Sequence, residues 1–115
     1  MPLHRGEIYF VNLNPVQGKE QAGNRPVLVL SSDSVNRLPF VVTVVVGTKG
    51  ENISKDYPTN VRILPADSGL AIETVFLCFQ IRSLDPKRFP TDAAGKVNNE
   101  TMKRVDDAVR YCLAL

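Results

Sequence analysis

Phe40-Val41-Val42-Thr43-Val44-Val45-Val46 is the stretch that decides the fold class of this chain. All seven side chains are β-branched or aromatic, and such side chains favour extended backbone. The apolar residues follow one another instead of alternating with polar ones, which is typical of a strand covered on both faces. The sequence therefore predicts that residues 40–46 form a central or interface-covered β-strand.

Shorter segments of the same character lie on either side of this strand. They are rich in β-branched and aromatic residues and are bounded by Pro, Gly or polar residues, which is the usual pattern of short strands. Val61 and Ile63 alternate with other side chains, which indicates a strand with one buried face. Five further strands are therefore predicted, over residues 7–13, 26–30, 60–64, 73–79 and 80–84.

Helical signals are fewer. The strong one covers residues 99–113, where Asn98 can accept hydrogen bonds from the free amides of the first turn. A shorter helix of one or two turns is predicted over residues 33–38, capped by Asp33 and ended by Pro39. The long helix carries apolar side chains at helical spacing on one face, which we expect to cover a sheet: Met102, Val105, Val109, Cys112 and Leu113.

Many short strands and one terminal helix predict a mainly β fold with a C-terminal helix (α+β), built as a small, strongly bent antiparallel barrel. The 115 residues suffice for one domain with a proper core, so residues 1–115 are expected to form a single domain. The longest polar stretch, residues 49–58, is predicted to be a loop at the rim of the barrel.

Composition excludes several classes of protein. The chain is 43% hydrophobic and 23% charged, as in globular proteins. No apolar run approaches the roughly 20 residues of a membrane span, and no signal-peptide region follows the charged start. A cytoplasmic protein without a membrane partner is expected. The net charge of +2 permits nucleic-acid binding without requiring it.

The cysteines and the histidine offer little for metal or thiol chemistry. Cys78 and Cys112 each lie among apolar residues, so both are predicted to be reduced core thiols and not nucleophiles. His4 is the only histidine, and it lies in an N-terminal segment that is expected to fray. One His and two distant Cys cannot form a zinc site. We expect neither a metal nor another cofactor.

A polar loop precedes the predicted strand at residues 26–30. It reads Gly18-Lys19-Glu20-Gln21-Ala22-Gly23-Asn24-Arg25-Pro26 and brings charged and amide side chains onto one short segment. Pro26 and the strand fix the backbone position of Arg25, and loops anchored in this way often carry functional sites. A solvated hairpin turn would have much the same composition.

Several motifs in this chain together match those of one known family. They are Arg5-Gly6-Glu7, Glu20-Gln21-x-Gly23-x-Arg25-Pro26, Val44-Val45-Val46-Gly47-Thr48, Ile72-Glu73-Thr74 and Gln80-Ile81-Arg82. Over nearly its whole length the chain resembles the MazF/PemK-type toxins. The loop motif is the specific one, and the later motifs add weight because they occur in the family's order. Gly47 is a departure from the apolar residue more usual at that position.

The resemblance implies a fold, an activity and partners. It implies the SH3-like barrel that MazF/PemK toxins share with CcdB toxins, and a homodimeric endoribonuclease that cuts single-stranded mRNA and stops growth. The expected protein partner is a MazE-like antitoxin. The toxin would contact DNA only indirectly, through this antitoxin. A homodimer is also expected from residues 41–46, because a barrel this small has too few layers to cover both faces of such a strand.

Three residues are candidates for catalysis: Arg25 and Thr48 by resemblance, and Glu20 as the only carboxylate in the loop. Arg25 would bind the scissile phosphate as negative charge develops, because a guanidinium is a planar fork of donors. Thr48 would donate a hydrogen bond to the phosphate from the strand end, where its hydroxyl can project. Glu20 could take the 2′-hydroxyl proton, or could only pair with Arg25. A mechanism with two histidines is excluded.

Further residues are candidates for RNA binding: Lys19, Gln21, Asn24, Lys49, Lys55, Phe79, Gln80 and Arg82. Arg62 also falls in or beside the loops that the resemblance places around one RNA-binding groove. Gln80 and Arg82 alternate, so they are predicted to lie on one side of their strand. Phe79 stands where the family usually has an acid; it could be a stacking platform for a base, although simple packing is the preferred interpretation.

Two other functions remain open. A CcdB-like toxin would bind DNA gyrase without catalysis, and it shares the expected fold, so the fold alone cannot decide. An inactive RNA-binding module would keep the basic groove without cleaving. The pair Arg25 and Thr48 discriminates, since a gyrase binder does not need it.

Overall fold

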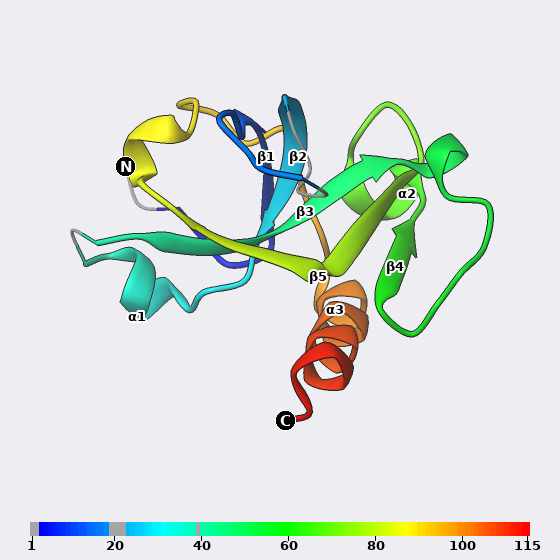
Figure 1. Cartoon of the computed structure of the whole chain (residues 1–115). Helices are drawn as coiled ribbons and strands as arrows, with labels where there is room; N and C mark the ends of the chain where they lie inside the picture. Colours follow the sequence, from blue (N-terminus) through cyan, green and yellow to red (C-terminus); the bar gives the residue numbers. More distant parts are fainter. Residues whose placement is uncertain (1–2, 19–22, 39) are drawn as a thin grey trace.

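Six antiparallel strands form one curled sheet, and the computed structural model describes it over residues 3–18, 23–38 and 40–115. The strand order is β4-β5-β3-β2-β1-β6, and α3 lies across one face (Figure 1). The strands are β1 (Glu7–Asn12), β2 (Asn24–Val29), β3 (Val42–Lys49), β4 (Asn60–Ile63), β5 (Thr74–Leu84) and β6 (Gly95–Lys96). The helices are α1 (Asp33–Asn36), α2 (Pro65–Ser68) and α3 (Asn99–Leu113), with 3₁₀ turns η1 (Gly50–Asn52) and η2 (Pro86–Arg88).

The predicted central strand is β3. It pairs with β2 on one side and with β5 on the other. Val44 and Val45, which point to opposite faces, are both fully buried. The argument that a second copy must cover this strand is therefore wrong, because the chain covers both faces itself.

The sheet curls where β3 meets β5. Val45 pairs with Ile81 but Val46 pairs with Leu77, so β5 carries extra residues at this point. Such a bulge bends a strand and increases its twist. The two segments predicted at residues 73–79 and 80–84 are consequently one bent strand, and the expected small barrel takes the form of an open half-barrel whose edges are β4 and β6.

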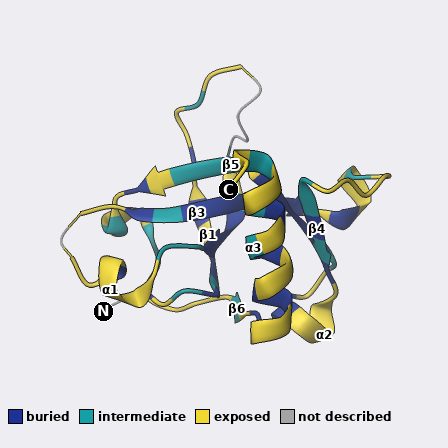
Figure 2. Ribbon diagram, turned by 90° about the horizontal axis from the view of Figure 1, so that it is seen from below, coloured by how far each residue is buried: buried dark blue, intermediate teal, exposed yellow. Residues whose placement is uncertain are grey.

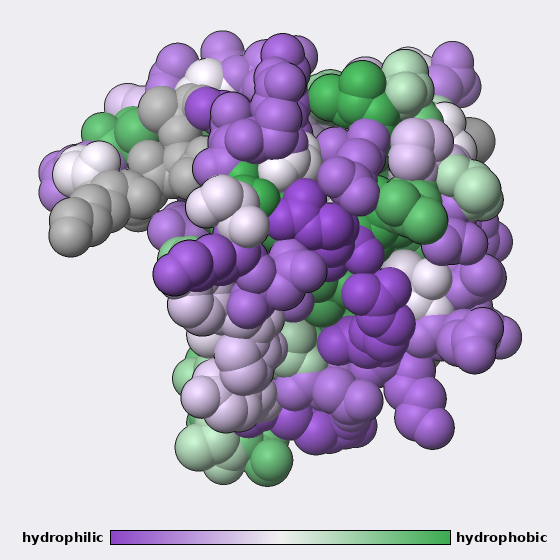
Figure 3. Space-filling view, turned by 90° about the vertical axis from the view of Figure 1, so that its right-hand side faces the viewer, coloured by the Kyte–Doolittle hydropathy of each residue, from purple (hydrophilic) through white to green (hydrophobic). Residues whose placement is uncertain are grey.

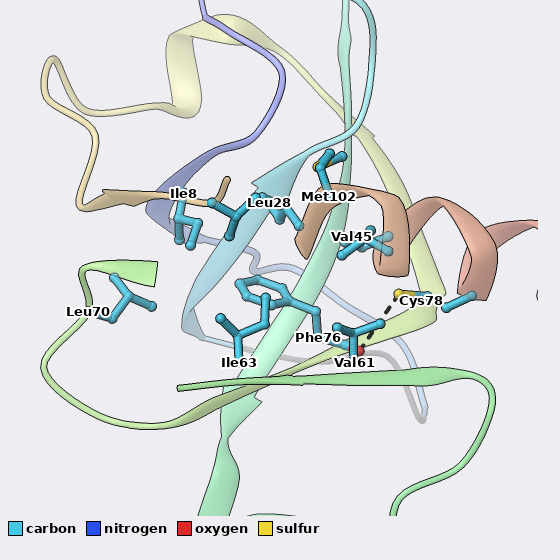
Figure 4. Packing of buried hydrophobic residues seen from close by; sticks show 12 residues of the cluster. Ile8, Leu28, Val45, Val61, Ile63, Leu70, Phe76, Cys78 and Met102 are labelled. Atoms are coloured by element: carbon cyan, nitrogen blue, oxygen red, sulfur yellow. Dashed lines mark hydrogen bonds between the residues drawn. The ribbon is translucent and has the colours of Figure 1, made fainter. Parts of the chain in front are cut away.

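Each face of the sheet has its own hydrophobic cluster. The first lies between the sheet and α3 and surrounds Phe76, which is fully buried (Figure 4). The second lies on the opposite face, where Tyr9, Val27 and Val46 pack with Phe89 from the segment after β5. Figure 2 shows the buried residues concentrated along β3 and the inner side of α3. The strands that carry the site are thus held from both sides.

The capping predictions are half correct. The Asn98 side chain accepts a hydrogen bond of 2.8 Å from the Thr101 amide at the start of α3, as predicted. The short helix α1 is capped by Ser32, whose hydroxyl accepts from the Val35 amide. The predicted cap Asp33 instead accepts from the backbone amide of Arg5, which lowers the pKa of Asp33. Pro39, the predicted end of that helix, lies outside the described residues.

The buried face of α3 differs at its end from the prediction. Met102 and Val105 are buried and Cys112 is partly buried, but Leu113 is 52% exposed. Thr101 and Ala108 join the buried face instead. The C-terminal turn of α3 extends past the sheet (Figure 1), and Leu113 in that turn is only about half covered.

Both cysteines are free thiols, as predicted. Burial is the main cause that raises the pKa of Cys78 to about 12, and burial also raises the pKa of Cys112. Thiols that stay protonated at neutral pH are poor nucleophiles. Separately, no described helix has the length and apolar character needed to cross a membrane.

Candidate functional site

Arg25 and Thr48 stand at the ends of neighbouring strands. In the ladder between β2 and β3, Val27 pairs with Val46 and Val29 with Val44. Two residues further in the same register, Arg25 faces Thr48. The ladder begins only at Val27, and Pro26 before it has no N–H to donate. The register therefore brings together the two residues that the family resemblance singled out.

The two side chains are in contact. Nη1 of Arg25 donates a long hydrogen bond of 3.4 Å to Oγ1 of Thr48. Thr48 also accepts a hydrogen bond of 3.0 Å from Nδ2 of Asn52, in the 3₁₀ turn that follows β3. The Thr48 side chain does not project freely from the sheet as predicted, because the residue is only 4% exposed.

Gly47 lets β3 pass close to its neighbours just before Thr48. A Cβ atom at this position would lie 2.9 Å from the Phe76 ring and 3.2 Å from Cγ of Pro26. Both contacts are closer than side chains normally approach, and the Phe76 ring is fixed in the core. The departure from the family's apolar residue is thus accommodated by a large partner on β5, and β3 continues through Gly47 to Lys49.

Two of the basic residues expected around the groove, Arg62 and Arg82, hydrogen-bond to acceptors within the protein. Nη1 of Arg82 donates to the carbonyl oxygen of Leu13 at 3.1 Å. Arg62 was placed near the groove for its charge, but its guanidinium binds two carboxylates, those of Asp56 and Glu73, and two carbonyl oxygens. Arg62 is therefore a structural residue and not a phosphate ligand.

The other predicted RNA-binding residues have varied positions. Asn24, Lys49 and Lys55 are exposed, and Gln80 is partly buried. Phe79 is 52% exposed, which does not fit simple core packing and keeps the stacking interpretation open. Lys19, Glu20 and Gln21 lie outside the described residues.

A pocket of about 340 Å³ adjoins Arg25. Its walls include Phe10, Pro26 and Ile72, with Lys49 at the border. Phe10 is 43% and Ile72 48% exposed. Sequence reasoning missed both, since isolated exposed apolar residues are common and only the fold shows that they share a pocket.

A second pocket, of about 550 Å³, is lined by His4, Glu7, Tyr9, Phe89 and Asp92, among others. The Tyr9 hydroxyl donates to Glu7 at 2.8 Å. The pKa of Tyr9 is raised, mainly by burial and also by this hydrogen bond. Carboxylates repel phosphate, so this pocket does not suit RNA. The backbone amide of His4 donates to Glu7 at 2.7 Å, so His4 itself is tied to β1 and not frayed as predicted.

Within residues 3–18, 23–38 and 40–115, no group of three or more His, Cys, Asp or Glu side chains is arranged to hold a metal ion. The described part of the site instead consists of a guanidinium, a hydroxyl and an amide. These groups can bind and orient a phosphate.

Comparison with known proteins places this geometry in a family. Residues 4–113 match the family described as PemK-like, MazF-like toxin of type II toxin-antitoxin system. The chain belongs to this family. It is 40% identical to Endoribonuclease EndoA of Bacillus subtilis (strain 168) over 116 residues, which cover 100% of this chain and 97% of that protein.

Solved structures of this toxin type have the same fold. The structure is similar to MazF from Deinococcus radiodurans with a TM-score of 0.82, at 24% identity over 100% of this chain and 99% of that one. It is similar to an endoribonuclease in complex with its cognate antitoxin from mycobacterial species with a TM-score of 0.79, at 25% identity over 98% and 96%. The predicted fold class is confirmed.

Proposed function

We propose that this MazF/PemK-type toxin is a metal-independent, sequence-selective endoribonuclease that cleaves single-stranded mRNA and thereby inhibits translation and growth. The observation that carries the proposal is the contact between Arg25 and Thr48 at the ends of β2 and β3. A gyrase-binding toxin has no use for this pair. The 40% identity to a protein named as an endoribonuclease supports the same choice.

The proposed reaction is attack of the 2′-hydroxyl on the neighbouring phosphorus. The bond between the 2′-oxygen and phosphorus forms as the bond to the 5′-oxygen breaks, and the departing 5′-oxygen takes a proton from solvent water, which leaves a 2′,3′-cyclic phosphate and a 5′-hydroxyl. Arg25 stabilises the charge that grows on the phosphoryl oxygens, and Thr48 donates a hydrogen bond to one of them. Glu20 remains the proposed acceptor of the 2′-hydroxyl proton.

Base and backbone recognition is proposed for side chains around this centre. Lys19, Lys49 and Lys55 would neutralise phosphates, and phosphate contacts position the strand without reading its sequence. Exposed Phe79 offers a face on which a base can stack. The remaining proposed contacts to the RNA come from Gln21, Asn24, Gln80 and Arg82.

The first test concerns the reaction chemistry. Incubated with a mixed RNA pool in EDTA, the protein should cleave as fast as without chelator, because no metal ion takes part in the proposed step. Sequencing the cut ends should identify one short motif, and end-group analysis should find a cyclic phosphate. Cleavage that needed added magnesium, or that left 5′-phosphates, would contradict the mechanism.

A homodimer is proposed for the active form, together with inhibition by a MazE-like antitoxin in the cytoplasm. Apolar side chains around the start of β3 support an interface between copies, because they are exposed within the chain: Val35 43%, Leu38 48%, Phe40 65% and Val41 46%. Apolar surface that gathers in one patch is the kind of surface that protein contacts cover.

The dimer can be measured directly. Light scattering at micromolar concentration should give about twice the chain mass of 12.7 kDa. Replacing Phe40 by aspartate should shift the protein toward the monomer, because the charge would be buried in the contact. A wild-type protein that is monomeric at these concentrations would rule out the proposed homodimer.

A further inference from the structure

The donor and acceptor state of the Thr48 hydroxyl is set by its neighbours. A threonine hydroxyl has two acceptor lone pairs and one proton to donate. Nδ2 of Asn52, at 3.0 Å, and Nη1 of Arg25, at 3.4 Å, both donate to this oxygen. With both lone pairs occupied, the Thr48 proton can only be donated. Among the described residues, the Thr48 hydroxyl donates its proton to no acceptor.

A phosphoryl oxygen is the acceptor that this arrangement suits. An ionised phosphate accepts hydrogen bonds and cannot donate one, so the hydroxyl must present its proton. If Asn52 were absent, the hydroxyl could rotate and direct its proton elsewhere. Asn52 therefore selects the useful orientation before the substrate arrives, which is electrostatic preorganisation.

The η1 turn that carries Asn52 is held by Arg62 from β4. The guanidinium contacts the η1 turn at both ends: Nη1 donates to the Gly50 carbonyl at 3.1 Å, and Nη2 donates to the Ile53 carbonyl at 2.6 Å. Nη1 is also 3.2 Å from Glu73, and Nε is 3.0 Å from Asp56. The chain between β3 and β4 runs along the right of Figure 1, and Figure 3 shows that side of the molecule, where hydrophilic residues predominate.

Gly50, the first residue of the turn, lies close against the side chains of Glu73 and Arg62. A Cβ atom on Gly50 would lie 2.8 Å from Oε2 of Glu73 and 3.1 Å from Nη1 of Arg62. The Gly50 amide also donates to the Glu73 carbonyl at 2.8 Å. The η1 turn that carries Asn52 is thus fixed from β4 and from the start of β5.

We propose that Asn52 is a positioning residue that fixes Thr48 as a hydrogen-bond donor to the scissile phosphate, with Arg62 as the anchor of the turn that carries Asn52. The inference rests on the proposed function. It assigns to the β3–β4 loop a role in the rate of the reaction, in addition to any contact with RNA.

The test is a set of rate measurements on one RNA that the parent protein cleaves. Asn52→Ala should lower kcat about tenfold with little change in KM, the scale of one hydrogen bond. Asn52→Asp should be at least as slow, because a carboxylate accepts the Thr48 proton and reverses the hydroxyl. Glu51→Ala, in the same turn and with no recorded side-chain contact, should leave kcat within about twofold.

A double-mutant cycle separates this role from a direct contact with RNA. Asn52 acts through Thr48, so Asn52→Ala should have almost no further effect on kcat in a Thr48→Ala background. Arg62→Lys should lower kcat in the same way, because an ammonium cannot make the four contacts. An additive effect of Asn52→Ala, or an Asn52→Asp protein as active as the parent, would overturn the proposal.

A measurement without RNA distinguishes failure of this inference from failure of the proposed function. In the NMR spectrum of the free protein, the Asn52 side-chain amide should shift when Thr48 is replaced by valine, and the shift should be absent for the neighbouring Glu51→Ala variant. An unchanged Asn52 amide would refute the hydrogen bond itself. A parent protein that cleaves no RNA would refute the proposed function while leaving this result intact.

Discussion

Arg25→Ala is expected to lower the rate of RNA cleavage by on the order of a hundredfold or more, roughly 3 kcal/mol, the scale for losing one preorganised donor at developing charge. Arg25 lies at the start of β2, and its guanidinium is oriented by the hydrogen bond to Thr48. Single-turnover cleavage of one defined RNA measures the effect without interference from product release.

Conservative variants identify what the site requires. Arg25→Lys should remain slow, because an ammonium keeps the charge but lacks the planar fork. Thr48→Ala should also be slow, and Thr48→Ser should recover part of the rate. All these proteins should keep the parent's circular dichroism spectrum and mass in solution. An Arg25→Ala protein that cleaves as fast as the parent would end this assignment of the site.

The strands could be predicted from the sequence because their signals are local. The valines of residues 40–46 favour extended backbone whatever surrounds them, and β3 duly lies at the centre of the sheet. The two-residue strand β6 has no such signal. It exists because Lys96 and Gly95 pair with Glu7 and Ile8 of β1, and this pairing depends on the whole fold.

The residues of the site could be predicted from the sequence alone, but the contacts between them could not. Arg25 and Thr48 were identified through a family motif, but their contact depends on the register of β2 against β3, which no local pattern shows. Asn52 was missed because an Asn in a polar loop is ordinary. Only the 3₁₀ turn reveals that its amide reaches Thr48.

The charges were the hardest to interpret. Arg62 and Lys55 look alike in the sequence, as basic residues in or beside the same polar loop. In the structure, the Arg62 side chain is 23% exposed and has acceptors around its guanidinium, whereas Lys55 is exposed. Net charge therefore overstated the cations that are available to phosphate.

Phe76→Ala is expected to cost about 3–5 kcal/mol of folding free energy, a large share of the roughly 5–15 kcal/mol that stabilises a typical domain. The ring is the largest side chain that is fully buried, and it lies at the centre of the cluster between the sheet and α3 (Figure 4). Removing it leaves a cavity that the neighbouring strands cannot close. It also removes the partner against which β3 packs at Gly47.

Phe79→Ala is the matched control, because Phe79 is on the same strand and is 52% exposed. Its loss should cost less than about 1 kcal/mol. Urea unfolding at one fixed protein concentration gives both values, since the proposed dimer makes stability depend on concentration. The Phe76→Ala protein should unfold at much lower urea, or fail to fold at 37 °C. Equal midpoints for the two variants would show that the core between the sheet and α3 does not hold the strand ends that carry Arg25 and Thr48.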